Sequence, residues 1–513
     1  MDLTRRTLLG TGAAAWTAAI LDPNVALAAD RTLTIALPNS PVTLDIIQIS
    51  NHDALAITNL IWENLLEVDL DGNVVPSLAA LPKISDDAQT FVFDLRDDVA
   101  FQNGQKLTAE DVKYSYEYTL DPKNKSIRRT LYDPIKEIVI ENPTRVVFRM
   151  KHPYRPWLQY MTKHMGIFPK GSREEKGDDF FKSTPIGVGT GPGIFVEWQK
   201  DAQIELKRNP NYWRKGVPAW ERLVAKIVPE DASRVAYLRT NQAQIISAPP
   251  PRDFQQLSKE PGIQTAHTVA IGGMWFMQLN NRRAPFDDVN FRKAISCSID
   301  RKGIAKDVFY GLMDPTATPA PTTVAYHNKE ADEAVGYNPE RAKDYLKKSK
   351  YADKAEFELL VPSIPYLFDA KDASVVMQSQ LAATGINVKL TQMEMPQILA
   401  RALAGTHGAT LLPLMASSDP TFVIQICYMP NQLMSKSSYY TSPELEAAMQ
   451  ESYKYTDADR LNPILKKIQA ILVEDCPHVW LGFVGVANAW RSEVRNFRPN
   501  SGLTMWVRDV TLA

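Results

Sequence analysis

The side chains that most often carry out chemistry are scattered along this chain rather than grouped. Seven histidines and three cysteines are spread over 513 residues, with no HExxH and no CxxC. The sequence therefore shows no set of zinc ligands of the kind a zinc hydrolase needs. We expect no metal, no cofactor and no catalytic residues. The chain also has no GxSxG nucleophile elbow and no GxxxxGKS/T phosphate loop. A glycosidase carboxylate pair stays open, because such pairing is spatial.

The most informative motif runs from Pro185 to Trp213 and reads PIGVGTGPGIFVEWQKDAQIELKRNPNYW. Four glycines at alternate positions allow close backbone approaches that a side chain would prevent. A nucleotide-loop interpretation fails, because Pro192 occupies the sixth position of GxGxxG and a strand pattern follows. That alternating pattern, interrupted by a polar turn, predicts a β-hairpin, and the two aromatics at the end belong to a further turn.

This stretch resembles the VGTGPY…LxRNPxYW signature of family 5 extracytoplasmic solute-binding proteins, the receptors of peptide-, nickel- and opine-type ABC importers. Gly193 stands where the family usually has tyrosine. An earlier block agrees, as WENLLEVDLDGNVVPSLA from Trp62 and TFVFDLRDDVAFQNGQKLTAEDVKYSYE from Thr90. A later block, PEDASRVAYLRTNQAQII, also resembles the family, with Asn241 at a usual glycine. The blocks occur in the family's order over most of the mature chain.

The resemblance implies an α/β protein with the two-lobed periplasmic binding protein type II fold and an extra subdomain on the first lobe. Mapped onto this chain, lobe I takes residues 30–50, 184–271 and 484–513, the extra subdomain 51–183, and lobe II 272–483. Helices and strands alternate in the last third, which predicts a largely parallel sheet in lobe II. A ligand would bind between the lobes and stabilise the closed form.

The resemblance also implies a ligand partner in lobe II. In peptide-binding members, a Trp-x-Ala-Asp segment supplies an aspartate for the peptide's α-ammonium group, a strong pair in a dry cleft. The matching positions here hold Leu414 and Ser417, and Asp419-Pro420 matches the acid and proline that follow. We take Ser417 and Asp419 as ligand-binding candidates. The alternative for Asp419 is to cap the next helix.

Five further residues are candidates for the wall of the cleft. Trp275 begins the strand that enters lobe II, and core packing is the alternative for it. Met415 and Tyr428 are expected to flank one lobe II strand, either in the core or in the cleft wall. Asn51 and His52 lie where the chain leaves lobe I; the alternative is that the next aspartate caps a helix and His52 is merely exposed.

The first 28 residues are typical of a signal peptide. A twin-arginine pattern at Arg5-Arg6, an apolar run over 8–21 and an Ala26-Leu27-Ala28 cleavage site predict export, with the mature chain beginning at Ala29. The apolar run is too short to span a bilayer. We therefore expect a periplasmic protein of a Gram-negative cell, exported in the folded state by the twin-arginine route.

Composition limits the partners. Hydrophobic residues make up 44% of the chain and charged residues 23%, as in globular proteins. The net charge of −1 gives no electrostatic reason to bind nucleic acid or anionic membranes. Cys297, Cys427 and Cys476 cannot all pair within one chain, so one disulfide and free buried thiols are both open. Nothing in the sequence indicates more than a monomer.

The favoured hypothesis is a periplasmic receptor that delivers a small polar solute to the permease of an ABC importer. A di- or oligopeptide ranks level with a non-peptide or modified-peptide solute, such as an opine or a sugar conjugate. A nickel chelate ranks third. Two other classes make different predictions: a periplasmic hydrolase requires turnover and a carboxylate pair, and a folding chaperone requires loose binding of unfolded chains.

Overall fold

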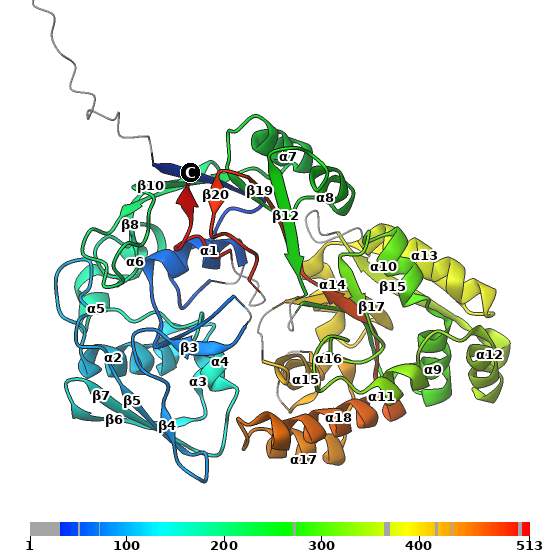
Figure 1. Cartoon of the computed structure of the whole chain (residues 1–513). Helices are drawn as coiled ribbons and strands as arrows, with labels where there is room; N and C mark the ends of the chain where they lie inside the picture. The colour runs from blue at the N-terminus through cyan, green and yellow to red at the C-terminus, as the bar shows by residue number, and fades with distance from the viewer. Residues whose placement is uncertain are drawn as a thin grey trace, which may run out of the picture.

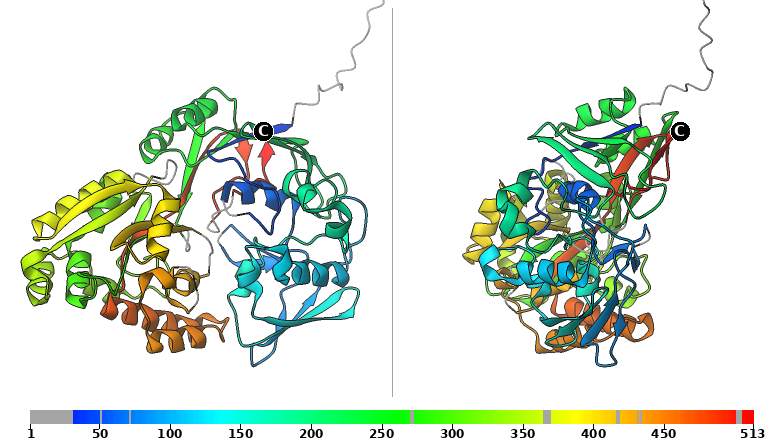
Figure 2. Two further views of the ribbon diagram at one scale, coloured as in Figure 1. Left: turned by 180° about the vertical axis from the view of Figure 1, so that it is seen from behind. Right: turned by 90° about the vertical axis from the view of Figure 1, so that its left-hand side faces the viewer.

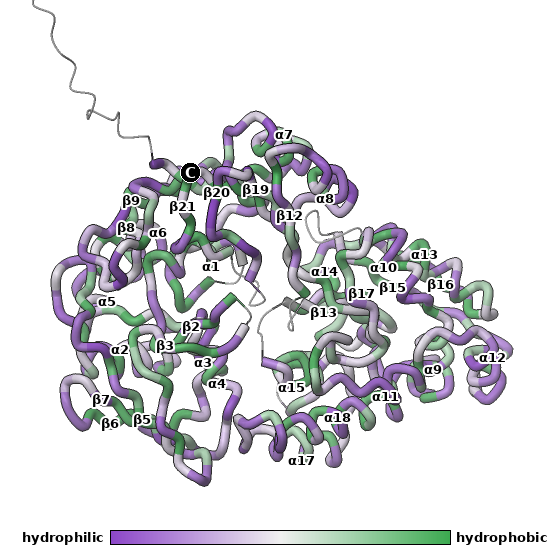
Figure 3. The backbone as a smooth tube through the Cα atoms, viewed as in Figure 1, coloured by the Kyte–Doolittle hydropathy of each residue, from purple (hydrophilic) through white to green (hydrophobic). Residues whose placement is uncertain are grey.

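The computed structural model describes residues 31–49, 52–70, 72–269, 273–363, 370–415, 419–430, 432, 434–500 and 505–513. These residues form two lobes side by side, with further elements attached to the first lobe (Figure 1). Figure 2 shows the same two lobes from behind and from the side. Hydrophobic residues concentrate in the strands inside the lobes, and outer helices such as α8 (Pro251–Leu257) and α12 (Pro339–Lys348) are mostly hydrophilic (Figure 3).

The first lobe is built on a seven-stranded mixed sheet in the order β12-β19-β11-β1-β10-β9-β8. The central strand β1 pairs in parallel with β10 and β11, and the other pairings are antiparallel. Its strands are β1 (Thr32–Leu37), β8 (Gly193–Gln199), β9 (Gln203–Arg208), β10 (Arg222–Ile227), β11 (Ile245–Ser247), β12 (Ile263–Thr268) and β19 (Val486–Arg491). The helices against this sheet are α1 (His52–Ile61), α7 (Asp231–Arg239) and α8. Two short ribbons pair β2 (Leu66–Val68) with β3 (Val74–Pro76) and β20 (Val494–Arg495) with β21 (Thr511–Leu512).

Between β3 and β8 the chain forms a separate four-stranded antiparallel sheet in the order β4-β5-β7-β6. Its strands are β4 (Lys83–Ile84), β5 (Thr90–Asp94), β6 (Ile135–Asn142) and β7 (Arg145–Met150). The helices of this part are α2 (Ala109–Leu120), α3 (Arg129–Tyr132), α4 (Trp157–Tyr160), α5 (Ser172–Lys176) and α6 (Asp178–Ser183), with a 3-10 turn, η1 (Pro122–Asn124). Helix α2 begins as predicted, because the N–H and hydroxyl of Thr108 both donate to Asp111 at 2.9 Å.

The second lobe is built on a six-stranded sheet in the order β14-β18-β13-β17-β15-β16. Its strands are β13 (Gly273–Leu279), β14 (Met313–Pro315), β15 (Glu356–Pro362), β16 (Asn387–Met393), β17 (Ala409–Met415) and β18 (His478–Val484). Its helices are α9 (Val289–Ser298), α10 (Arg301–Asp307), α11 (Lys329–Ala334), α12, α13 (Ala370–Ala383), α14 (Met395–Leu403), α15 (Phe422–Tyr428), α16 (Ser435–Ser438), α17 (Pro443–Ser452) and α18 (Ala458–Asp475), with a 3-10 turn, η2 (Ala352–Lys354).

The prediction of a largely parallel sheet in lobe II is wrong. Only β15 forms parallel pairs, with β16 and β17, and the pairs that involve β13 and β18 are antiparallel. Helices α13 and α14 are the crossovers that make the neighbouring strands parallel. Strands β13 and β18 instead enter and leave the lobe from the other sheet, and that route reverses their direction relative to β17.

The two main sheets are joined where β12 leads into β13 and where β18 leads into β19. In the first lobe β12 and β19 are antiparallel partners along their whole length, from Ile263 opposite Arg491 to Thr268 opposite Val486. Both crossings therefore leave the first sheet side by side, and β12 runs toward the second lobe in Figure 1. Such paired strands are a natural hinge.

The glycine-rich stretch forms the predicted hairpin, and its first half packs on the end of α1. Strands β8 and β9 are antiparallel partners. The N–H of Gly191 donates to the carbonyl of Ile61 at 3.0 Å, and a Cβ at Gly189 would lie 1.9 Å from that same oxygen. At Gly193, where the family has tyrosine, a Cβ would lie 2.8 Å from Leu206. These glycines serve close packing of the loop against a helix.

Gly189→Ala is accordingly expected to lower the free energy of unfolding by about 2–3 kcal/mol, because the new methyl group would meet a backbone oxygen that cannot rotate away. Calorimetric melting checks this. The matched control is Gly187→Ala in the same stretch: Gly187 has a φ of +77° and its nearest contact is Asn103 at 3.8 Å, so only a strain of roughly 1 kcal/mol is expected. Equal melting temperatures for the two variants would contradict the packing argument.

Three smaller features complete the fold. Asn241, at the position of a usual glycine, has a φ of +58°, which asparagine tolerates better than most side chains. Cys297, Cys427 and Cys476 are all buried and free. Among the described residues, no helix combines the length and the apolar character that a membrane span requires.

Candidate functional site

The extra subdomain and lobe II touch each other through a buried ion pair. Nη1 of Arg155, just before α4, lies 2.5 Å from Oδ2 of Asp419, just before α15. The side chain of Asp419 has no exposed surface, and that of Arg155 is 10% exposed. Asp419 also accepts a hydrogen bond from the N–H of Thr421 at 2.8 Å, in the turn that leads into α15. The acid is thus fully engaged by protein groups.

Aromatic and amide side chains extend this contact. The hydroxyls of Tyr154 and Tyr160 both donate to Oε1 of Gln425 in α15, each at 3.1 Å. The ring of Tyr160 packs edge-on against Phe422 at 5.7 Å, and that of Tyr154 against Tyr453 at 5.2 Å. One continuous buried cluster includes these side chains from both parts of the molecule. We call this contact, with the ion pair, the lobe latch.

Two of the predicted site residues are core residues of lobe II. Trp275 is 2% exposed and packs in the cluster that contains Met277 and Leu279. Tyr428 is 2% exposed and ends helix α15, and its hydroxyl lies 2.8 Å from Nδ1 of His478 in strand β18. Burial raises the pKa of Tyr428 well above its usual value and lowers that of His478 to about 3, so both groups are neutral.

The other predicted residues lie at the edges of the described chain. Met415 ends β17 and His52 begins α1; for these two residues the structure describes the backbone and not the side chain. Asn51 and Ser417 lie outside the described residues. Asp53, in the first turn of α1, accepts a hydrogen bond from Asn39 Nδ2 at 2.6 Å.

A buried carboxylate links α1 to the glycine-rich hairpin. Glu63 accepts hydrogen bonds from the hydroxyls of Tyr212 at 2.7 Å and Thr190 at 2.9 Å, and from Nε1 of Trp213 at 3.0 Å. Burial raises the pKa of Glu63, and the bonds from Tyr212 and Trp213 oppose that rise. The aromatics of the Asn-Pro-Asn-Tyr-Trp turn therefore act as donors to this carboxylate, a role that spacing alone does not indicate.

Glu63→Gln is expected to lower the free energy of unfolding by about 1–3 kcal/mol, because the amide nitrogen would face a buried donor instead of accepting from it. Urea unfolding followed by circular dichroism measures this. Glu110→Gln is the matched control: Glu110 is 53% exposed in an ion pair with Lys170, and its loss should change stability by less than about 1 kcal/mol. A Glu63→Gln midpoint equal to that of the control would contradict the role of Glu63.

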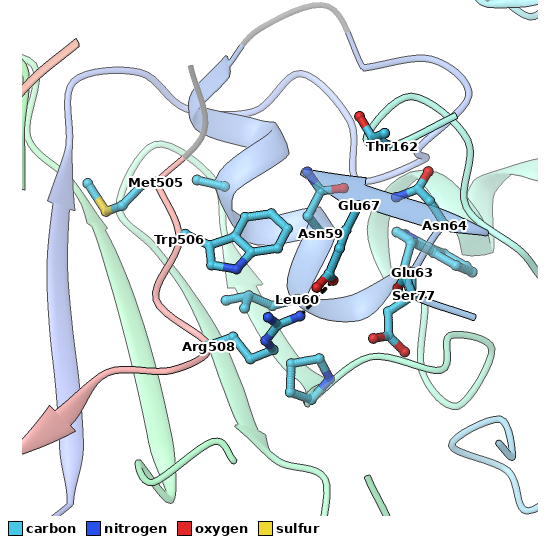
Figure 4. A pocket seen from close by; sticks show the side chains of 13 residues that line it. Asn59, Leu60, Glu63, Asn64, Glu67, Ser77, Thr162, Met505, Trp506 and Arg508 are labelled. Atoms are coloured by element: carbon cyan, nitrogen blue, oxygen red, sulfur yellow. Dashed lines mark hydrogen bonds and ion pairs between the residues drawn. The ribbon is translucent and has the colours of Figure 1, made fainter. Parts of the chain in front are cut away.

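Next to Glu63, a small pocket of about 20 Å³ lies between α1, the subdomain and the C-terminal segment (Figure 4). The side chains of Trp506 and Arg508 point from the C-terminal segment into this region, and Arg508 Nη1 lies 2.9 Å from Oε2 of Glu67. Arg214 Nη2 lies 2.6 Å from the other oxygen of Glu67. These ion pairs tie the chain end to the first lobe beside α1.

Sequence reasoning missed Arg155 as a residue of the contact. The segment Tyr154-Arg155-Pro156-Trp157 places an arginine between aromatic residues, a pattern that suits a buried ion pair. Its partner, Asp419, is 264 residues away, and no feature of the neighbouring sequence identifies it. Among the described residues, no group of three histidine, cysteine, aspartate or glutamate side chains is arranged to hold a metal ion.

Two lobes joined by paired crossing strands and closed on each other are the architecture of a periplasmic binding protein. The chain belongs to the bacterial extracellular solute-binding proteins, family 5, whose family model (Bacterial extracellular solute-binding proteins, family 5 Middle) matches residues 73–432. The periplasmic binding protein AgaA in complex with agropinic acid, from A. tumefaciens R10, is 25% identical with a TM-score of 0.79, over 94% of this chain and 99% of that one.

Curated relatives agree with this family. The chain is 28% identical over 454 residues to Di/tripeptide-binding protein 2 of Pseudomonas aeruginosa (strain UCBPP-PA14), a match that covers 83% of this chain and 84% of the relative. It is 24% identical over 504 residues to Glutathione-binding protein GsiB of Salmonella typhi, with 93% and 94% covered. The predicted family and the predicted two-lobed α/β fold are confirmed.

Proposed function

We propose that this protein is the substrate-binding component of an ABC importer, which captures a small polar solute between its lobes by hinge closure and delivers it to the permease without catalysis. The observation that carries this proposal is the pairing of a two-strand hinge with a buried lobe latch at Arg155 and Asp419. A protein with those two features can exchange between open and closed forms, and a ligand that contacts both lobes favours the closed one.

The proposed solute is a di- or oligopeptide, a peptide-like compound, an opine or a sugar conjugate. The names of the relatives support this range, since they include a di/tripeptide-binding protein, a glutathione-binding protein and a protein in complex with agropinic acid. A nickel chelate ranks below these. A hydrolase is not favoured by any feature of the site.

The proposed binding residues are Asn51 and His52, where the chain leaves lobe I, and Met415 and Ser417, which precede the latch residue Asp419 in sequence. We propose Asp419 as a latch residue rather than a direct ligand partner, because Arg155 and Thr421 already engage it. Trp275 and Tyr428 are supporting core residues, on the evidence of their burial.

The proposed domain limits are those mapped from the sequence: lobe I at 30–50, 184–271 and 484–513, the extra subdomain at 51–183 and lobe II at 272–483. The separate sheets and the crossings after β12 and β18 support this division. We also propose a signal peptide at 1–28, export by the twin-arginine route and a periplasmic location, supported by the pattern of the first residues. We propose a monomer as well.

Native mass spectrometry of the mature protein, followed by thermal-shift screening of peptides, opines, sugar conjugates and nickel chelates, tests the function. A ligand that binds the folded form raises the melting temperature with increasing concentration. Saturable stabilisation by one of these classes, without conversion of the compound, supports the proposal. Turnover of the ligand, or stabilisation by none of these classes, would contradict it.

A further inference from the structure

A tyrosine of lobe II lies beside the lobe latch. Tyr326 belongs to the loop between β14 and α11, and its ring packs against the buried cluster that includes latch residues from both parts of the molecule. Burial raises the pKa of the Tyr326 hydroxyl well above its usual value; the charge of Asp419 also raises it, and the charge of Arg155 opposes the rise. The hydroxyl therefore lies near both charges of the ion pair that joins the lobes.

The loop that carries Tyr326 is anchored to helix α18. Gln469 of this helix is 2% exposed, and its Nε2 donates to the carbonyl of Tyr326 at 2.7 Å. The Oε1 of Gln469 accepts from the N–H of Asn328 at 2.9 Å. The side chain of Asn328 in turn accepts from the N–H of Ala331 and caps α11. These bonds fix the backbone around Tyr326, so its ring stays beside the latch.

The hydroxyl of Tyr326 differs from the other tyrosine hydroxyls of the latch. Those of Tyr154 and Tyr160 both donate to Oε1 of Gln425, each at 3.1 Å. The Tyr326 oxygen is buried, and no group of the described residues lies within hydrogen-bond distance of it. A buried polar group without a partner is destabilising, because it has given up hydrogen bonds to water and gained none in return.

We infer that Tyr326 opposes lobe closure and thereby lowers the affinity of the protein for its solute. This inference rests on the proposed function and concerns its regulation. When the lobes part, Arg155 and its neighbours move away with the subdomain, and water can reach the Tyr326 hydroxyl. When the lobes close, no described protein group replaces that water. The ion pair and the bonds to Gln425 favour the closed form, whereas Tyr326 favours the open form from which the solute is released.

Tyr326→Phe tests this inference, because it removes the hydroxyl and retains the ring. Alanyl-alanine, glutathione and agropinic acid are each titrated by calorimetry into the full mature chain. We expect Tyr326→Phe to bind whichever of these compounds the wild type binds about 10-fold more tightly, since a larger fraction of the protein is then in the closed form. Small-angle X-ray scattering of the ligand-free variant should give a smaller radius of gyration than the wild type.

Two variants with the same chemical change serve as controls. Tyr337 is 51% exposed on the same lobe, so Tyr337→Phe should bind and scatter as the wild type does. Tyr160→Phe removes a hydroxyl that donates across the contact, so it should have the opposite effect: a larger radius of gyration and weaker binding. The double variant Tyr160→Phe/Tyr326→Phe should lie between the two single variants. It measures the effect of Tyr326 in a protein whose closed form is less populated.

The outcomes separate the inference from the proposed function. If Tyr326→Phe leaves the radius of gyration and the affinity unchanged in both backgrounds, whatever its effect on the melting temperature, the hydroxyl does not act on closure and the inference is wrong. If Tyr326→Phe weakens binding and Tyr337→Phe does not, Tyr326 contacts the solute directly and the inference is overturned. The solute-binding function stands in both cases. If none of the three compounds binds the wild type, the proposed solute range fails, and the scattering comparison decides the role of Tyr326.

Discussion

Gly485→Ala is expected to lower the free energy of unfolding by more than about 3 kcal/mol and to change the angle between the lobes. Gly485 separates β18 from β19 at one of the two crossings. A Cβ at this position would lie 1.3 Å from the carbonyl oxygen of Thr268 and 2.2 Å from its carbonyl carbon. Both are backbone atoms at the end of β12, so no change of rotamer can relieve the overlap.

The overlap that Gly485→Ala creates can be relieved only if β12 and β19 move apart where they leave the first sheet. That place is the proposed hinge. Differential scanning calorimetry measures the loss of stability, and small-angle X-ray scattering measures the change in radius of gyration. Gly262→Ala, at the start of β12, is the matched control: its φ is +79° and no atom lies within 4 Å of the added methyl group. That control should cost about 1 kcal/mol and leave the scattering unchanged. If Gly485→Ala melts and scatters like the control, the proposed close packing of Gly485 against Thr268 at the hinge is wrong.

Local features of the fold could be predicted from the sequence because their causes are local. The β8–β9 hairpin follows from alternation and a polar turn, and the start of α2 follows from Thr108 with Asp111 three residues later. The pairing directions in lobe II could not be predicted in this way. The strand β13 pairs with β17, at least 130 residues further along the chain, and with β18, at least 200 residues further, and alternation of helices and strands does not reveal that route.

The candidate site was predicted less well, for the same reason. The sequence singled out Asp419 as a ligand partner or a helix cap; in the structure it accepts from the N–H of Thr421 in the turn before α15, and Thr421 itself is the N-cap of that helix. The main partner of Asp419, Arg155, lies in the extra subdomain, and a single sequence gives no measure of that proximity. Core and cleft wall were both open for Tyr428, because its packing against His478, 50 residues further along the chain, cannot be inferred from its sequence position.

Asp419→Ala is expected to destabilise the closed form by about 3–5 kcal/mol, because it leaves Arg155 buried without its counter-charge. The contact joins the subdomain to lobe II, so the loss should appear in lobe closure as well as in melting. Scattering from the ligand-free protein should give a larger radius of gyration than the wild type. The affinity for the solute found by screening should fall, since a smaller fraction of the protein is then in the binding-competent form.

Comparison with Arg155→Ala separates a latch from a ligand contact. If Asp419 acts through Arg155, the two single variants should lose similar affinity, and the double variant Arg155→Met/Asp419→Leu should recover part of the stability, because two apolar side chains replace two buried charges. Asp133→Ala serves as the control, since Asp133 pairs with Arg129 at the surface and is 47% exposed. A direct contact between Asp419 and a cationic ligand group predicts the opposite pattern: Asp419→Ala would lose far more affinity than Arg155→Ala, and the double variant would bind as poorly as Asp419→Ala. Such a result would return Asp419 to the binding site.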